Sequence, residues 1–250
     1  MKKTLLFLLI LVSVYLLIAE DIPVQRDTTA TGLVYRLETV IEEKSLDNGA
    51  GFSIYLDYPV FEGDDPLSQA INRYVYDLIN TAYTGPDGEK TSYSDYHLLA
   101  KDKLKAWAQN QEDYELGIEW SIGIRISYTG EMITLSTNEY GYSGGAHGYS
   151  VPSYMMFDNL GRKIDWKNLL APESQQQFQQ FLLTNFVQPD YEGWEHDRNY
   201  ILNPLACALT ETGMEVIYEG GCYAEGFPCL EIPKAQIRPL LKQQYQEMYK

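Results

Sequence analysis

The residues best suited to chemistry lie in one short loop. The stretch Tyr142–Ser143–Gly144–Gly145–Ala146–His147–Gly148 places a hydroxyl and an imidazole among three glycines. Glycine lets the backbone adopt positive φ or approach another group closely. Tyr140 precedes the loop and Tyr149 follows it. Such a loop can be a binding site or a tight crossover between two strands, and spacing alone does not distinguish the two.

A serine and a histidine in one loop raise the question of hydrolysis. Ser143 and His147 are only four residues apart, a spacing that seldom presents a nucleophile and its base to each other. No GxSxG elbow is present. The chain has 35 acidic residues, but no pair stands out as the two carboxylates of a glycosidase. The residues therefore favour a non-catalytic protein, with an enzyme as the alternative.

The sequence offers no pattern for a metal or a cofactor. The three histidines, His97, His147 and His196, share no ligand spacing such as HxxxH, and no CxxC accompanies them. Phosphate-binding patterns of the GxxxxGKS or GxGxxG type do not occur. We therefore expect neither a metal site nor a bound cofactor.

The three cysteines, Cys207, Cys222 and Cys229, all lie in the last fifth of the chain. An oxidising compartment would allow one disulfide and leave one thiol. The pair Cys222–Cys229 is the favoured candidate because it would close a loop that contains glycine and proline.

The net charge of −16 and the pI of about 4.5 exclude one class of function. Nucleic-acid binding needs clustered lysines and arginines, and no such cluster occurs outside the N-terminus. An acidic surface favours cationic partners, although solubility alone would also account for it.

The N-terminus has the pattern of an export signal. A basic start, Met1–Lys2–Lys3, precedes an apolar run from Leu5 to Ala19, which is shorter than the roughly 20 residues of a membrane-spanning helix. The pattern predicts a signal peptide over 1–19 and an extracytoplasmic location, periplasmic or secreted, in a bacterium. Its removal takes two positive charges and changes the net charge from −16 to −18. The alternative is an uncleaved segment that anchors the protein to the membrane.

Hydrophobic periodicity predicts separate groups of helices and hairpins. Strands are expected over 34–41, 52–61, 114–128, 131–142 and 149–158, and helices over 66–82, 94–109, 165–170 and 175–186. A hairpin is expected over 205–218 and a last helix after Pro239. Residues 20–33 are expected to form a leader without regular structure. Residues 188–203 form an irregular aromatic stretch with Tyr191 and Trp194.

This grouping predicts an α+β fold, with antiparallel sheets, helices packed on one face, and two intimately packed subdomains. The expected division is a signal peptide at 1–19, a leader and first strand at 20–45, and subdomains at 46–141 and 142–250. The chain has no internal repeat.

The order of motifs resembles the RsiV-like extracytoplasmic domain family. The Gly-Gly-Ala-His loop is followed by Phe157–Asp158, then by Gly161–Arg162–Lys163–Ile164, and then by Trp166 and Leu169–Leu170. Segments 213–218, 223–226 and 230–233 are similar to the closing strands of that family. Upstream, 54–59 and the 66–82 helix are similar to its companion N-terminal domain.

The resemblance implies binding rather than catalysis. Its members include the outer domain of a lysozyme-sensing anti-sigma factor and the non-catalytic part of some peptidoglycan deacetylases. The sequence has no recognisable anti-sigma segment before the apolar run and no deacetylase domain after the fold, so neither activity is expected here. In addition, Cys222 precedes Tyr223 where the family tends to have proline.

We therefore expect an exported, non-catalytic binding protein of the cell envelope that recognises lysozyme or a peptidoglycan or other glycan ligand. The alternatives are a peptidoglycan-acting hydrolase or deacetylase-related enzyme, and a structural envelope protein. The candidate binding residues are Tyr140, Tyr142, Ser143, Gly144, Gly145, His147, Tyr149, Tyr191 and Trp194.

Overall fold

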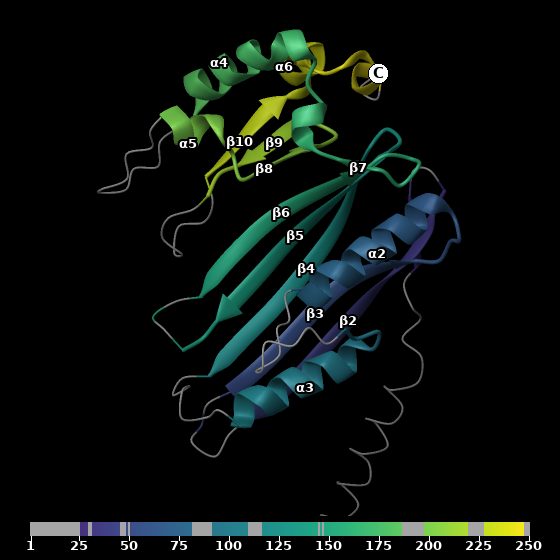
Figure 1. Ribbon diagram of the computed structural model, residues 1–250, viewed down its shortest axis with the longest axis vertical. Coiled ribbons are helices and arrows are strands. Elements are labelled where there is room, and N and C mark those ends of the chain that lie inside the picture. The colour runs from purple at the N-terminus through teal and green to yellow at the C-terminus, as the bar shows by residue number, and fades with distance from the viewer. Residues whose placement is uncertain are drawn as a thin grey trace, which may run out of the picture.

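A computed structural model describes residues 26–29, 32–45, 49, 51–81, 92–109, 117–144, 146, 148–186, 198–219 and 228–247. Two sheets of different size dominate it, and helices pack against each of them (Figure 1). The fold is α+β, as the sequence predicts.

The larger sheet has seven strands that follow one another in chain order. They are β1 (Arg26–Thr28), β2 (Val34–Ser45), β3 (Gly51–Phe61), β4 (Ile118–Thr129), β5 (Met132–Tyr142), β6 (Tyr149–Phe157) and β7 (Lys163–Ile164). Neighbouring strands are antiparallel except β3 and β4, which run parallel. The predicted β4–β5 hairpin is confirmed, and Gly130 in its turn has a φ of 60°.

The parallel pair exists because two helices connect β3 to β4. These are α2 (Pro66–Thr81) and α3 (Tyr96–Gln109). The start of α2 follows the sequence closely: Asp65 Oδ1 accepts hydrogen bonds from the backbone N–H groups of Leu67 and Ser68, at 3.0 and 2.9 Å. Pro66 occupies the first helical position, where its missing N–H is not needed.

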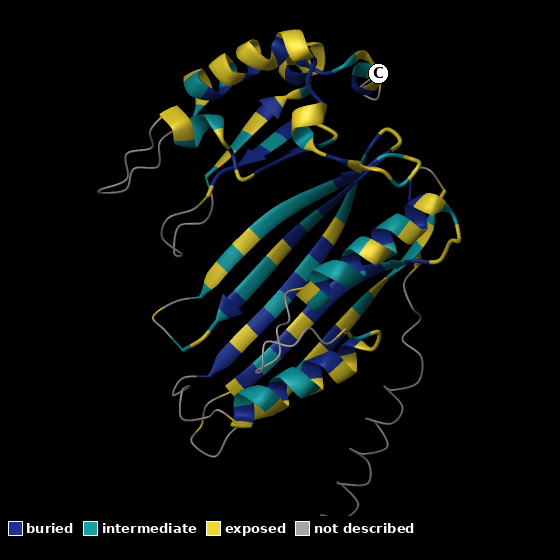
Figure 2. Cartoon of the chain, in the orientation of Figure 1, coloured by how far each residue is buried: buried dark blue, intermediate teal, exposed yellow. Residues whose placement is uncertain are grey.

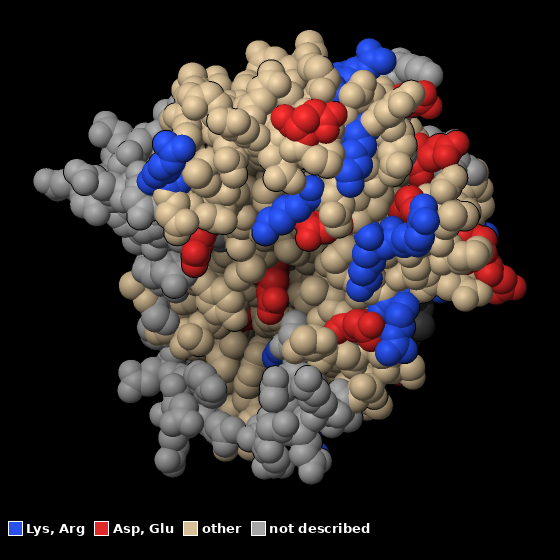
Figure 3. Space-filling model, turned by 45° about the horizontal axis from the view of Figure 1, so that its top comes forward, with Lys and Arg blue, Asp and Glu red and all other residues tan. Residues whose placement is uncertain are grey.

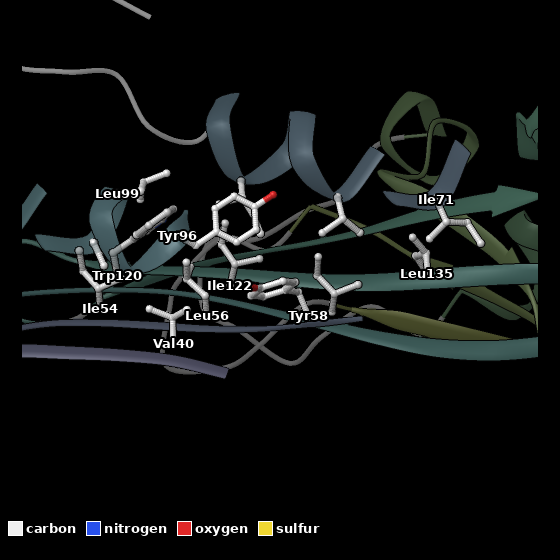
Figure 4. Packing of buried hydrophobic residues seen from close by; sticks show 14 of the residues in the cluster. Val40, Ile54, Leu56, Tyr58, Ile71, Tyr96, Leu99, Trp120, Ile122 and Leu135 are labelled. Atoms are coloured by element: carbon white, nitrogen blue, oxygen red, sulfur yellow. The ribbon is translucent and has the colours of Figure 1, made fainter. Parts of the chain in front are cut away.

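Both helices lie on the same face of the large sheet, which we call the covered face (Figure 1). Figure 2 shows the resulting alternation of buried and exposed residues along the strands. In β4, Ile118, Trp120, Ile122 and Ile124 are buried, whereas their odd-numbered neighbours are not. Figure 4 shows the core between sheet and helices, where Tyr58 and Tyr96 meet edge to face with ring centroids 5.0 Å apart.

The smaller sheet consists of β8 (Ala206–Leu209), β9 (Gly213–Ile217) and β10 (Cys229–Pro233), in the order β10-β9-β8. Helices and 3-10 turns accompany it. The helices are α4 (Gln175–Asn185), α5 (Arg198–Leu202), α6 (Lys234–Ile237) and α7 (Gln243–Gln246), and the 3-10 turns are Trp166–Asn168, Pro172–Ser174 and Arg238–Leu240. Its core includes Phe178, Leu182, Val216, Ile232 and Leu241. Met132 and Met156 of the large sheet belong to this core too, so the small sheet packs over one end of β5 and β6.

Several expected boundaries differ from the observed ones. Residues 26–28 form β1 rather than part of an irregular leader, because β2 provides a backbone edge with which they pair. The expected subdomain boundary between 141 and 142 falls at the end of β5, and β6 continues the large sheet. Within 188–203, Arg198–Leu202 are helical. The expected last helix is a 3-10 turn followed by α7.

Candidate binding face

The face of the large sheet opposite α2 and α3 carries mostly short polar side chains; we call it the open face. Because side chains alternate along a strand, the open face receives the odd-numbered residues of β4. Register then adds Tyr142, Tyr140, Asn138 and Ser136 of β5, and Ser150, Pro152 and Tyr154 of β6. Ser121, Tyr140 and Ser150 lie side by side across three strands, and so do Arg125, Ser136 and Tyr154.

The tyrosines of the open face are spread along it. Tyr142 lies at the end of β5, and Tyr154 lies opposite Ser136, six residues away along the same strand. At a rise of roughly 3.4 Å per residue, this separation is about 20 Å. All three tyrosines, Tyr140 included, are partly exposed, and the Ser150 hydroxyl donates to Asn138 Oδ1 at 2.5 Å between them.

The loop singled out by the sequence splits its tyrosines between the two faces. Tyr149 pairs with Gly141, on the covered face, whereas Tyr140 pairs with Ser150, on the open face. A methyl group added at Gly141 would overlap the ring of Tyr149, and one added at Gly148 would overlap the ring of Tyr140. These two glycines thus make room for tyrosine rings lying across the strands. That requirement explains both glycines without a ligand.

Of the remaining loop residues, Ser143 is exposed and Gly144 has a φ of 84°, where a side chain would strain the backbone. Tyr140, Tyr142, Ser143 and Gly144 are therefore neighbours at one end of β5. The predicted site residues Gly145, His147, Tyr191 and Trp194 lie outside the described residues, and so does Cys222.

A cavity of about 360 Å³ opens beside Tyr142. Its polar lining combines two carboxylates, Glu43 and Glu119, and the ammonium of Lys44 with the hydroxyls of Ser45, Ser53 and Tyr142. Glu119 is the partner of Tyr142 in the β4–β5 ladder and of Ser53 in the β3–β4 ladder. This end of the open face is therefore hollowed and lined by charges of both signs, with one more acidic than basic group.

The other end of the open face meets the small sheet. Tyr154 hydrogen-bonds to Glu215 of β9, and burial together with that carboxylate raises the pKa of Tyr154. Glu215 and Glu231 are opposite each other on β9 and β10 and line a cavity of about 260 Å³ with Thr210 and Thr212. The Cys229 thiol donates to Glu215 Oε1 at 3.4 Å, and burial raises its pKa to about 12. The Cys222–Cys229 disulfide stays a prediction.

One ion pair crosses the open face between these ends. The guanidinium of Arg125 donates to Asp57 Oδ2 at 2.5 Å, and Thr39 donates to the other carboxylate oxygen at 3.3 Å. Asp57 is buried while Arg125 is largely exposed. The pair satisfies a carboxylate that would otherwise be buried unpaired, and it leaves guanidinium edges on the surface.

On the covered face, a lysine of α3 lies against aromatic rings. Lys103 Nζ of α3 is 3.5 Å from the ring centroid of Trp120, whose Nε1 donates to Glu139 Oε1 at 3.1 Å. Burial lowers the pKa of Lys103 to about 8, and Glu139 opposes that shift. The same carboxylate and burial raise the pKa of Tyr149. This cluster secures α3 against β4 and β5.

Two further features concern only the described part of the chain. There, no three histidine, cysteine, aspartate or glutamate side chains gather closely enough to hold a metal ion. No helix among these residues has the length and apolar character needed to cross a membrane. The predicted signal peptide at 1–19 lies outside that part, and its removal remains a prediction.

Most of the open face carries no distinct signal in the sequence. Ser121, Ser136, Asn138 and Ser150 are not among the predicted site residues, because single polar residues in strands are common. The available signal was the alternation of isoleucine and tryptophan with polar residues between 118 and 125. It indicates one solvent-facing side, but only the strand register brings these residues together.

Comparison with known proteins finds a family match for part of the chain. Residues 47–150, fewer than half of the total, match the family model described as Deacetylase PdaC. That region runs from β3 through both helices to the start of β6. No curated protein matches the chain.

Two solved structures share the fold. A member of the DUF3298 family from Bacteroides fragilis NCTC 9343 superposes with a TM-score of 0.61 at 17% identity, covering 86% of this chain and 97% of that one. A DUF3298 family protein from Pseudomonas aeruginosa PAO1 gives 0.55 at 16% identity, covering 84% and 95%. At this identity the likeness concerns the fold alone. The family match concerns residues 47–150 alone, and the finer RsiV-like resemblance stays a prediction.

Proposed function

We propose that this chain is a non-catalytic binding protein of the bacterial cell envelope and that a peptidoglycan glycan strand binds along its open face. The observation that carries the proposal is the row of Tyr142, Tyr140 and Tyr154 over about 20 Å, with serine and asparagine side chains between them. Tyrosine offers an apolar ring for a sugar face and a hydroxyl for its polar edge. Short hydroxyl and amide side chains add hydrogen bonds without blocking a flat ligand.

Further support comes from the groups at the ends of this row. Arg125 presents unfilled guanidinium donors that suit the carboxylate or carbonyl groups of a peptide-bearing glycan. The two carboxylates of the cavity beside Tyr142 suit hydroxyl donors of a sugar or an amino group. The arrangement lacks a nucleophile with a base beside it in the described residues, which is why binding is proposed rather than hydrolysis.

The test is retention of the purified protein on insoluble sacculi, together with calorimetric titration of soluble glycan fragments. Tyr140→Ala and Tyr154→Ala should each reduce binding about tenfold or more, by loss of a stacking surface. Tyr149→Ala is the matched control, because Tyr149 neighbours Tyr140 but lies on the covered face. Equal losses for Tyr149→Ala and Tyr140→Ala would remove the open face from consideration.

A second candidate ligand is a basic, lysozyme-like protein. The observation in its favour is the net charge of −16, together with the carboxylates of Glu43 and Glu119 in the cavity beside Tyr142, which they line with Lys44. On the face drawn in Figure 3, acidic and basic side chains are interspersed, so that face has no broad area of a single sign. Charge attraction would therefore concentrate at the Tyr142 end.

Calorimetric titration with a basic lysozyme at two salt concentrations distinguishes recognition from charge attraction. Saturable one-to-one binding that persists at physiological salt, and that Glu43→Gln with Glu119→Gln abolishes, would support this candidate. Heat that disappears as salt rises would leave only nonspecific attraction. Because the glycan test uses uncharged tyrosine changes, the two proposals can fail separately.

A further inference from the structure

Among the described residues, part of one edge of the large sheet has no neighbouring strand. β1 pairs with Val34–Arg36 only, so among the described residues no strand lies beside β2 from Leu37 to Ser45 on that side. This free edge is nine residues long, longer than many complete strands. Natural proteins usually shorten, bend or cover such an edge, because it can pair with another strand.

The direction of the backbone groups along this edge follows from two hydrogen bonds. The carbonyl of Val34 accepts from Glu62 N, toward β3, at 3.0 Å, and the carbonyl of Leu33 accepts from Thr29 N, on the opposite side, at 2.8 Å. Because successive residues of a strand direct these groups to alternate edges, those of Leu37, Thr39, Ile41, Glu43 and Ser45 point away from β3. Five donors and five acceptors thus line up along the free edge.

Two apolar side chains are exposed at this edge, although Glu38, Glu42, Glu43 and Lys44 lie in the same stretch. Ile41 is 57% exposed and Leu37 is 41% exposed, both on the open face. Tyr55, beside Ile41 on β3, is also exposed. Together they form a small apolar strip that follows the unpaired backbone.

In one register, self-pairing of this stretch sets opposite charges against each other at two places. If two copies of β2 pair antiparallel with Ile41 opposite Ile41, then Leu37 faces Ser45, Thr39 faces Glu43, Val40 faces Glu42, and Glu38 faces Lys44. The outward-pointing residues 37, 39, 41, 43 and 45 all fall opposite one another, so this register uses the whole free edge. Glu38 and Lys44 thus face each other twice, once on each side of the axis, and the Glu38 carboxylate also accepts from Arg36 Nε at 2.7 Å and from the Tyr58 hydroxyl at 2.8 Å in its own chain.

We propose that a second copy of this chain pairs with the free edge of β2, antiparallel and about a two-fold axis at Ile41, so that the two large sheets become one. Residues opposite each other in a ladder point to the same face, so the two open faces join into one surface. The proposal does not depend on the ligand proposed above, but the joined surface would give a glycan strand two adjoining sites. The isologous pairing also closes the assembly at two copies.

Sedimentation equilibrium of the purified chain over a wide concentration range tests the proposal. We expect a monomer–dimer equilibrium, which Ile41→Pro abolishes at every concentration. Proline removes the outward N–H of Ile41 and no hydrogen bond to β3, so the thermal unfolding of the monomer should change little. A monomer at all concentrations, or a dimer unaffected by Ile41→Pro, would overturn the proposal.

Charge reversal at either position tests the register, because mixing the two variants should restore the pairing. Lys44→Glu places a glutamate opposite Glu38 at both contacts and should weaken self-association about tenfold. Glu38→Lys should do the same. An equimolar mixture of the two variants restores both opposite-charge pairs and should form a heterodimer, whereas a general folding defect in either variant would not be rescued by mixing.

A cross-link fixes the register. Ile41→Cys places two thiols opposite each other across the axis, within reach of a disulfide, and should form covalent dimers on mild oxidation. Leu37→Cys, also exposed and on the same face, lies far from its copy and should not cross-link. Peptide mapping separates this bond from those of the native cysteines, and equal cross-linking at both positions would contradict the proposed register.

Discussion

The covered and open faces of the large sheet are built from alternate residues of the same strands, but they are held together differently. On the covered face, Ile54, Leu56 and Ile122 lose all or nearly all of their exposure against α2 and α3. On the open face, their chain neighbours Tyr55 and Ser121 stay in contact with solvent, and Asp57 is buried only with an arginine beside it. Stability is therefore concentrated on one side of each strand, which leaves the other side free to vary in chemistry.

Replacing two adjacent residues of β3 by alanine, one on each face, should give the largest difference in the free energy of unfolding. Ile54→Ala removes a fully buried side chain from the covered face and should lower the free energy of unfolding by about 2–5 kcal/mol. Tyr55→Ala, one residue along but on the open face, should lower it by less than about 1 kcal/mol. Urea denaturation of both variants measures the difference. Similar losses would mean that the open face is covered in solution.

On the open face, the ion pair of Arg125 and Asp57 should contribute to folding stability in the way that a core contact does. Arg125→Met removes the main partner of a buried carboxylate and should destabilise the fold by about 1–3 kcal/mol. Adding Asp57→Asn removes that charge and should recover part of the loss. The double-mutant cycle gives the coupling directly. A coupling near zero would class the pair with ordinary surface salt bridges.

The pH dependence of unfolding should reveal Lys103 on the covered face. Its folded pKa, about 8, lies below the usual value for lysine, so between pH 8 and about 10 this side chain is protonated in the unfolded chain and increasingly neutral in the native state. The stability of the unsubstituted protein relative to that of Lys103→Met should therefore rise over this range, by about 1–2 kcal/mol, because the cation–π contact with Trp120 offsets part of the burial effect.

In both proteins, groups whose folded pKa is raised lower the stability as the pH increases, because the unfolded chain loses their protons first. They include the Cys229 thiol and buried tyrosines such as Tyr96, both with a pKa raised to about 12. Unfolding curves of both proteins at a series of pH values measure the difference in stability. A difference that stays constant between pH 8 and 10 would contradict the lowered pKa of Lys103.

The sequence predicted the local elements well where one physical signal was strong. The cap at Asp65 and the apolar spacing after Pro66 predicted α2, and the structure confirms its start. The turn at Thr129–Gly130 predicted the β4–β5 hairpin for the same local reason. The α+β class followed from helices and hairpins occurring in separate groups.

The candidate site was harder to predict, because it depends on register. Tyr140 and Tyr149 are close in sequence and were grouped together, but the pairing of Gly141 with Tyr149 puts their rings on opposite faces. Ser136 and Tyr154 are distant in sequence and become direct neighbours. A shift of one residue would have reversed every one of these assignments.

By itself, the sequence determined which residues of each strand are buried together, where the first helix begins and how acidic the protein is, since periodicity, capping and charge are local properties. Only the tertiary structure decided that β3 and β4 run parallel, that the small sheet closes one end of the open face, and that no described strand lies beside β2 from Leu37 to Ser45. Those features depend on which backbone edges meet, and residues far apart in the chain carry no local signal of their pairing.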